Sequence, residues 1–190
     1  MTTIATARYS VPILLTDIAV GLVLVMVVLI VVTALAHLFM ATPYGPTPLP
    51  VAREMIRLAE LQGDETVYDI GAGDGRLLIE AKRQVPGIRA KGFEIALGVW
   101  LMGKLCVWCS GQRVCLRFQN ALKVHLADAD VIFLYLFPGL LRRLESKFDA
   151  ELRPGTKVIS HVFRFPGRKP LREVRVPWRR GEKTILVYEW

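Results

Sequence analysis

The sequence predicts an α/β domain, built on a mostly parallel sheet with helices on both faces and preceded by one N-terminal transmembrane helix. Three observations lead to this fold class. The run IAVGLVLVMVVLIVVTALA, residues 18–36, contains no charge and no proline. Behind it, short apolar segments alternate with segments of helical periodicity, which is typical of βαβ units and a parallel sheet. A glycine-rich turn, GAGDG at residues 71–75, follows the first of these short segments.

Length, charge and cysteine content limit the number of domains, the kind of partner and the chance of a metal site. A chain of 190 residues can form one domain with an appendage but not two full domains. The net charge of +8 favours an acidic partner, which could be anionic lipid, nucleic acid or an acidic protein face. Cys106, Cys109 and Cys115 lack a fourth Cys or His at ligand spacing, so we expect packing and no metal site.

The apolar run matches the length of about 20 residues that crosses a hydrocarbon core, and it is apolar on every face. The alternative is a cleaved signal peptide, since Arg8 precedes the run and Ala34 and Ala36 form an A-x-A site, although the run is longer than an ordinary signal-peptide core. Arg53 and Arg57 follow the run, which predicts a cytoplasmic membrane protein with its domain in the cytoplasm. A mitochondrial inner membrane is the alternative location.

We therefore divide the chain into an anchor at 1–41, a proline-rich connector at 42–50 and a folded domain at 51–190. The prolines of TPYGPTPLP favour an extended connector. A helix is predicted over 51–63, with Gly63 as its stop signal.

The remaining elements alternate along the chain, without internal repeats. The last segment is expected to pair antiparallel at or near a sheet edge. Strands are predicted at 66–70, 89–94, 114–118, 130–136, 156–163 and 183–190, and helices at 76–84, 96–109 and 139–152.

The glycine turn is predicted to hold a ligand, because ligands of open α/β sheets bind at the carboxyl ends of the strands. Gly71 and Gly73 let the backbone approach a ligand without a Cβ in the way, and Gly75 opens the following helix. The spacing is GxGxG, since Arg76 stands where a dinucleotide fingerprint has its last glycine. There is also no Lys-Ser or Lys-Thr pair for a phosphate-binding loop.

Acidic and amide side chains around this turn indicate the kind of ligand. Asp69 and Asp74 would repel a pyrophosphate but suit an ammonium and a sulfonium; Asp69 could instead hold the turn through backbone amides. Glu94 ends the second strand, where a carboxylate can accept hydrogen bonds from a ribose diol; the alternative is a strand-end carboxylate in water. Asn120 follows the third strand and could meet an adenine edge. These features describe an adenosine that carries a charged amino acid.

DIGAGDGR, together with the second-strand acid and the later asparagine, resembles the cofactor signature of class I S-adenosylmethionine-dependent methyltransferases. The resemblance covers Thr66 to about Tyr135. It implies a Rossmann-like methyltransferase fold and S-adenosyl-L-methionine as the cofactor. The cofactor-binding residues would be Asp69, Gly71, Gly73, Asp74, Gly75, Glu94 and Asn120.

A closer resemblance spans nearly the whole chain. The anchor and the segments PYGPTP, GFEI, LESKFDAEL and FRFPGRKP are similar to the membrane-anchored protein-lysine methyltransferases of mitochondria and their prokaryotic relatives. Those mitochondrial enzymes modify the ATP synthase c-subunit and the adenine nucleotide translocase, so the resemblance implies a membrane-protein substrate. Where they read roughly FGVPQMM, residues 135–141 of this chain read YLFPGLL, which leaves the acceptor open.

Methyl transfer is an in-line displacement, so the protein chiefly aligns the groups and excludes water. Tyr135 and Pro138 are predicted catalytic residues that shape the acceptor mouth, where an apolar surface would keep a lysine amine neutral. Phe133 and Tyr135 could instead be alternating core residues of a strand. His161 could act as a base or a gate, or be a packed or surface residue.

The basic stretch at 164–180 could dock on anionic lipid, form a solvated face or bind nucleic acid, but no nucleic-acid recognition module is present.

Taken together, the motifs and the resemblance predict a membrane-anchored protein-lysine N-methyltransferase that acts on a membrane protein. Two alternatives are a small-molecule or lipid methyltransferase and a non-catalytic membrane adaptor that has kept the fold.

Overall fold

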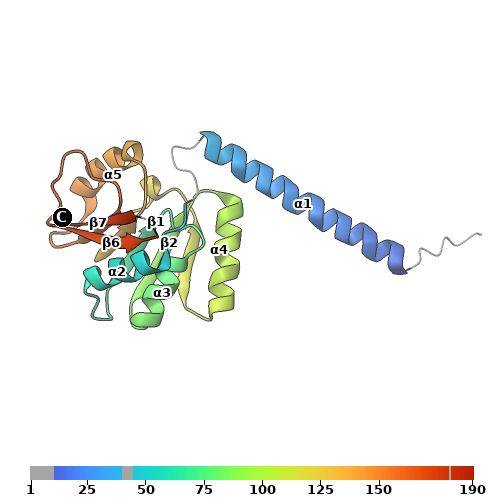
Figure 1. Ribbon diagram of the computed structural model, residues 1–190, viewed down its shortest axis with the longest axis horizontal. Helices are drawn as coiled ribbons and strands as arrows, with labels where there is room; N and C mark the ends of the chain where they lie inside the picture. The colour runs from blue at the N-terminus through green and yellow to red at the C-terminus, as the bar shows by residue number, and fades with distance from the viewer. Residues whose placement is uncertain (1–10, 40–44, 180) are drawn as a thin grey trace, which may run out of the picture.

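The computed structural model describes residues 11–39, 45–179 and 181–190. A long helix, α1 (Val11–Phe39), leads away from a domain in which helices flank a central sheet (Figure 1). The predictions that concern Arg8, the first residues of the connector (42–44) and Arg180 lie outside the described residues.

A seven-stranded sheet of order β3-β2-β1-β4-β5-β7-β6 forms the centre of the described domain. The first five strands are parallel, and β7 runs antiparallel between β5 and β6. This arrangement confirms the predicted fold class. The strands are β1 (Thr66–Ile70), β2 (Arg89–Glu94), β3 (Val114–Phe118), β4 (Val131–Leu134), β5 (Lys157–His161), β6 (Arg172–Trp178) and β7 (Gly181–Glu189).

Helices cover both faces of the sheet, because its central strands are apolar on both sides. All five residues of β1 are buried. Val67 joins one hydrophobic core and Tyr68 joins the other. The first core lies under α2 (Leu49–Ala59), α3 (Arg76–Gln84) and α4 (Leu97–Ser110), and the second under α5 (Pro138–Glu151) and the short 3₁₀ helix η1 (Ala121–Lys123).

The helix before β1 begins earlier than predicted and ends earlier. Pro48 is its N-cap and Pro50 lies in its first turn, where a missing amide costs nothing. It ends at Ala59, because Glu60 adopts the left-handed conformation with φ 54°. Pro48 and Pro50, which the sequence analysis assigned to the connector, therefore form the start of this helix.

Strand β6 was not predicted, and it lies inside the basic stretch. It pairs with β7 at the edge of the sheet, so only one side of its backbone is hydrogen-bonded within the sheet. Its residues are exposed or half-buried and include Pro177, which an edge strand tolerates. A strand with so little burial lacks the apolar signature on which the prediction relied. The prediction that the last strand pairs antiparallel near an edge is confirmed.

Among the described residues, one helical segment, Leu15–Leu35, is long and apolar enough to cross a membrane. Its side chains are exposed around the helix, for example Leu22 at 66% and Leu35 at 50%. Near its end, Thr33 lies against Gly98 at the start of α4, where an added Cβ would collide with the Thr33 hydroxyl. The helix therefore touches the domain at α4.

Candidate active site

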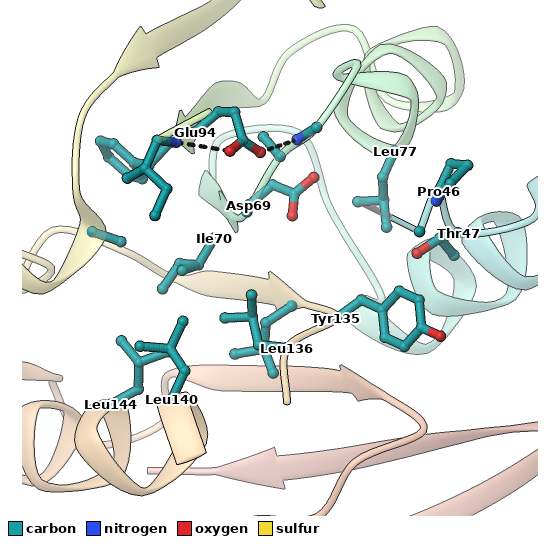
Figure 2. Close-up of a pocket in the computed structure, with 18 of the residues that line it drawn as sticks. Pro46, Thr47, Asp69, Ile70, Leu77, Glu94, Tyr135, Leu136, Leu140 and Leu144 are labelled. Carbon is teal, nitrogen blue, oxygen red and sulfur yellow. Dashed lines mark hydrogen bonds between the residues drawn. The ribbon is translucent and has the colours of Figure 1, made fainter. Parts of the chain in front are cut away.

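A pocket opens at the carboxyl ends of β1, β2 and β4, the edge at which the sequence predicted ligand binding. Figure 2 shows the carboxylates of Asp69 and Glu94 near one another, and Tyr135 beside Thr47 on another side of the space. Its wall comes from the glycine turn, the segments that follow β2, β3 and β4, and the stretch just before α2.

The glycine turn folds back on the end of β2. Gly71 and Gly73 have positive φ angles of 79° and 59°, which side chains rarely adopt. The amides of Gly71 and Ala72 both donate to the carbonyl of Phe93, at 2.9 and 3.0 Å. A Cβ on Gly71 would lie 3.0 Å from the Leu136 side chain, so the turn is also close to the segment after β4.

Glu94 holds the same turn from the other side. One carboxylate oxygen accepts from the Gly73 amide at 3.0 Å, and the other accepts from the amides of Ile95 and Ala96 at 2.8 and 2.9 Å. The residue is only 8% exposed, which excludes the alternative of a carboxylate in water. Glu94, and not Asp69, therefore accepts the amide of the glycine turn.

Three acidic side chains line this end of the pocket. Asp69 is buried, and burial, followed by the charges of Glu94 and Asp74, raises the pKa of Asp69 to about 8. Asp74 is paired with Arg76 at 2.6 Å. A pocket end lined by three carboxyl groups suits a ligand that brings positive charge, as the sulfonium and ammonium of the expected cofactor would.

The structure brings most of the predicted site residues together. Two of them do not line the pocket. Gly75 is the N-cap of α3 and packs near Val107, and Pro138 is the first residue of α5. The predicted residues that line the pocket are Asp69, Gly71, Gly73, Asp74, Glu94, Asn120 and Tyr135.

Asn120 also has a local structural task. Its side-chain oxygen accepts from the Leu122 amide at 3.0 Å and so caps η1. This bond fixes the side chain beside the pocket, on the segment between β3 and η1.

The opposite end of the pocket is aromatic. Tyr135 follows β4 rather than lying within it, while Phe133 is a fully buried core residue of that strand. The ring of Phe163 lies 6.1 Å from Tyr135 and 5.1 Å from Phe137, between ring centroids. The sequence analysis identified only Tyr135 of this wall.

His161 lies behind the wall, fully buried at the end of β5. Its ring centroid is 4.2 Å from that of Tyr135, and its Nδ1 is 3.4 Å from the Thr47 hydroxyl. Burial, with a smaller contribution from Lys183, lowers the pKa of His161 to about 4. Among the described residues, its Nε2 is a buried side-chain nitrogen with no hydrogen-bond partner. His161 is thus a neutral packed residue, as one sequence alternative stated.

Several pocket residues were missed from sequence. Gly45, Pro46 and Thr47 belong to the predicted connector, yet they line the pocket. Phe137 and Phe163 looked like ordinary loop and strand-end residues. The signal that could have found them is the local composition, since PYGPTP and FRFPG place rigid and aromatic residues next to predicted strand and helix ends.

The described residues contain no group of three or more His, Cys, Asp or Glu side chains that could hold a metal ion. Cys106 is half-buried against the core, in line with the expected packing. Cys109 and Cys115 are exposed, so the packing prediction was wrong for these two. Cys109 lies on α4, and Cys115 lies on the edge strand β3.

Comparison with known proteins identifies the family. Residues 69–172, more than half of the chain, match the family described as the ANTKMT methyltransferase domain. A protein-lysine N-methyltransferase of Saccharolobus islandicus (strain REY15A) is 32% identical over 148 residues, which cover 77% of this chain and 92% of the relative. The chain belongs to the ANTKMT methyltransferase family. It is an S-adenosylmethionine-dependent methyltransferase, as the sequence predicted.

Other relatives of this ANTKMT-family chain are larger. The adenine nucleotide translocase lysine N-methyltransferase of Mus musculus is 37% identical over 129 residues, which are 65% of this chain and 52% of that protein. The chain thus spans about half the length of this mouse relative. An RNA methyltransferase structure from Salinibacter ruber, in complex with S-adenosyl-L-homocysteine, has a TM-score of 0.71 and 31% identity over 76% of this chain and 93% of the other.

Proposed function

We propose that this chain is a membrane-anchored protein-lysine N-methyltransferase that modifies a lysine of a membrane protein. The observation that carries the proposal is a pocket with two unlike ends, an acidic end at the glycine turn and an aromatic end at Tyr135, Phe137 and Phe163. The printed names of the relatives support lysine as the acceptor, since they are protein-lysine N-methyltransferases.

The acidic end would hold the cofactor. Asp69 and Asp74 would offer carboxyl groups to its cationic groups, and Glu94, which holds the turn, would accept from its ribose. The bound cofactor supplies a methyl group on a sulfonium, a carbon already activated for displacement. The task of the protein is then to position the incoming amine and to exclude water.

The aromatic end would receive the lysine. Its rings form an apolar surface, and desolvation there lowers the pKa of an amine and favours the neutral nucleophile. Tyr135 lies on this wall beside Thr47, and its hydroxyl would orient the amine (Figure 2). Pro138 starts α5 directly behind the Tyr135 segment and fixes the course of the chain there.

Membrane anchoring is supported by α1. Its apolar segment is exposed in the structure, so an apolar medium is the surrounding that suits it. Arg53 and Arg57 follow it, which supports a cytoplasmic domain at the cytoplasmic membrane, with the mitochondrial inner membrane as the alternative.

The basic stretch lies apart from the proposed anchor. The strands β6 and β7 lie on the side of the domain away from α1 (Figure 1). Three of its arginines form ion pairs on the protein surface: Arg164 with Glu173, Arg168 with Asp149 and Arg175 with Glu182. These contacts favour a solvated face.

The test is transfer of labelled methyl groups to native membranes. Full-length protein in lipid vesicles is mixed with membranes and methyl-labelled S-adenosylmethionine, with Glu94→Ala as the inactive control. We expect label in an integral protein, recovered as methylated lysine after hydrolysis. Label confined to the lipid extract or to small molecules would overturn the proposal in favour of the other enzyme class. Because the Salinibacter ruber structure is that of an RNA methyltransferase, RNA is offered as acceptor in a parallel assay. Labelled RNA would also overturn the proposal.

A further inference from the structure

We propose that the outer face of α4 rests on the surface of the bilayer beside α1, as a second membrane contact of the domain. This inference rests on the proposed membrane anchoring. The α4 face is defined by six exposed apolar side chains: Ile95, two residues before the helix, and Leu97, Leu101, Met102, Leu105 and Trp108 on it.

Helix α4 is apolar on both sides. Its inner side packs on the sheet through Val99, Gly103 and Val107, which are buried. On the outer side Leu105 is 57% exposed and Trp108 is 79% exposed. A helix that covers a sheet in water normally has a polar outer side, and a continuous apolar face is typical of an interaction surface.

The α4 face is continuous with the helix proposed to span the membrane. Thr33 is close to the end of the apolar segment Leu15–Leu35, and it contacts Gly98 in the first turn of α4. The place where α1 leaves the hydrocarbon is therefore the place where α4 begins. In Figure 1 α1 leaves the domain on the α4 side, so the bilayer surface meets this helix before the rest of the domain.

The surroundings of the face match a bilayer surface better than a second protein. Lys104 lies on α4, Arg113 directly precedes the edge strand β3 and Arg117 lies within it; all three are exposed. Phe118 is 52% exposed and its ring lies 5.8 Å from that of Trp100. Apolar residues bordered by cations and aromatic rings are characteristic of helices that lie in the interface of an anionic membrane.

The contact would also orient the active site. Ile95 belongs to the α4 face and lines the pocket. With α4 on the bilayer, the carboxyl edge of the sheet, where the pocket opens, is held next to the head groups. A lysine close to the end of a transmembrane segment is then within reach, which narrows the substrate to residues near the membrane surface.

Tryptophan quenching by brominated lipid tests the contact directly. Full-length protein is reconstituted in vesicles of phosphatidylcholine and phosphatidylglycerol with brominated acyl chains. Trp108→Phe removes the residue on the α4 face, and Trp178→Phe on β6 is the matched control. We expect quenching in the wild type that is mostly lost in Trp108→Phe and kept in Trp178→Phe. Equal quenching in all three proteins would overturn the inference.

A charge on the face gives a second readout. Leu105→Glu is expected to abolish most of the Trp108 quenching, whereas Leu171→Glu, at a leucine that is 71% exposed before β6, leaves it unchanged. Cofactor binding by calorimetry verifies that both variants are folded. If Trp108 quenching is lost only at protein concentrations at which dimers form, the α4 face contacts a second copy of the chain. That result would overturn the inference.

Vesicle flotation after an alkaline wash separates this inference from the proposed function. Protein that stays with the vesicles while Trp108 is not quenched contradicts only the α4 contact. Protein that is washed off contradicts the anchor and with it the α4 contact.

Discussion

The two ends of the pocket are built in different ways. The acidic end comes from one continuous stretch, β1 to the residue after β2, and backbone amides bonded to Phe93 and Glu94 hold it together. The aromatic end is assembled from separate segments, with Thr47 before α2, Tyr135 after β4 and Phe163 after β5. The first end is held by contacts between neighbouring segments of the chain, and the second depends on packing between distant ones.

Their electrostatics differ as well. The acidic end gathers three carboxyl groups, and burial together with the neighbouring carboxylates raises the pKa of Asp69, so that ionising it there requires a compensating positive charge. The aromatic end avoids charge, since burial lowers the pKa of His161 and keeps the imidazole neutral. One end therefore suits a cation, and the other suits a neutral amine.

Glu94→Ala should have the largest effect, because the variant removes the carboxylate that accepts three backbone amides at the acidic end. Hydrogen bonds to charged groups contribute about 1.5–3 kcal/mol each, so we expect cofactor affinity to fall by at least about a hundredfold. Calorimetry on the full-length protein in detergent measures it. A folded variant that binds with wild-type affinity would show that the turn does not depend on Glu94.

The contrast between the ends also explains what could be predicted from sequence. The glycine spacing, the acids and the strand ends are local signals, and they placed Asp69, Gly71, Gly73, Asp74 and Glu94 on the pocket wall. The helix over 76–84 and the strands over 66–70, 89–94 and 114–118 were predicted with the bounds that the structure has.

The residues that sequence reasoning missed depend on contacts between distant segments. Thr47 and His161 are in contact although they are 114 positions apart in the chain, and no local sequence pattern predicts this contact. Strand β6 is stabilised by pairing with β7 rather than by burial, so its alternation of charged and apolar residues did not stand out. Long-range packing, and not local propensity, decides these features.

The neutral state of His161 gives the second prediction, which tests the aromatic end. Its folded pKa of about 4 lies below the ordinary 6.5, so the unfolded chain binds the proton first as the pH falls. Stability from this group is present above pH 6.5 and is lost as the pH falls toward 4. We expect a loss of about 2 kcal/mol between pH 7 and about pH 4.5.

Thermal unfolding of the wild type and of His161→Gln across this pH range measures the effect. Carboxylates that titrate at acidic pH affect both proteins equally, so the difference between the two slopes isolates His161. Parallel slopes would mean that the imidazole takes up its proton at the same pH in the folded and the unfolded protein, so that the aromatic end tolerates charge.

Asp69 gives the third prediction, which tests the acidic end. Because the pKa of Asp69 is about 8 without cofactor, a cationic ligand must displace its proton at neutral pH. We expect proton release on binding, and an affinity that weakens by up to about tenfold per pH unit as the pH is lowered from about 8 to 6. Calorimetry in two buffers of different ionisation enthalpy counts the protons.

Asp69→Asn is the control for this linkage, since the amide cannot release a proton. The variant should bind more weakly near pH 8 and show less dependence on pH. Wild-type binding without proton exchange would indicate that Asp69 is already ionised, and the charge of the acidic end would then be balanced by another group.

Gly71→Ala should have the smallest effect on binding and separates backbone strain from ligand contact. Gly155 provides a matched control, because its φ of 88° resembles the 79° of Gly71, yet an added Cβ meets no atom within 4 Å. Both variants should lose about 1–2 kcal/mol of stability from the left-handed conformation. Gly71→Ala should also weaken cofactor binding several-fold, since Gly71 lines the pocket and its Cβ would press on Leu136. Equal cofactor binding by both variants would mean that Gly71 is needed only for the conformation of the turn. Gly73 would then be the glycine that the cofactor approaches closely.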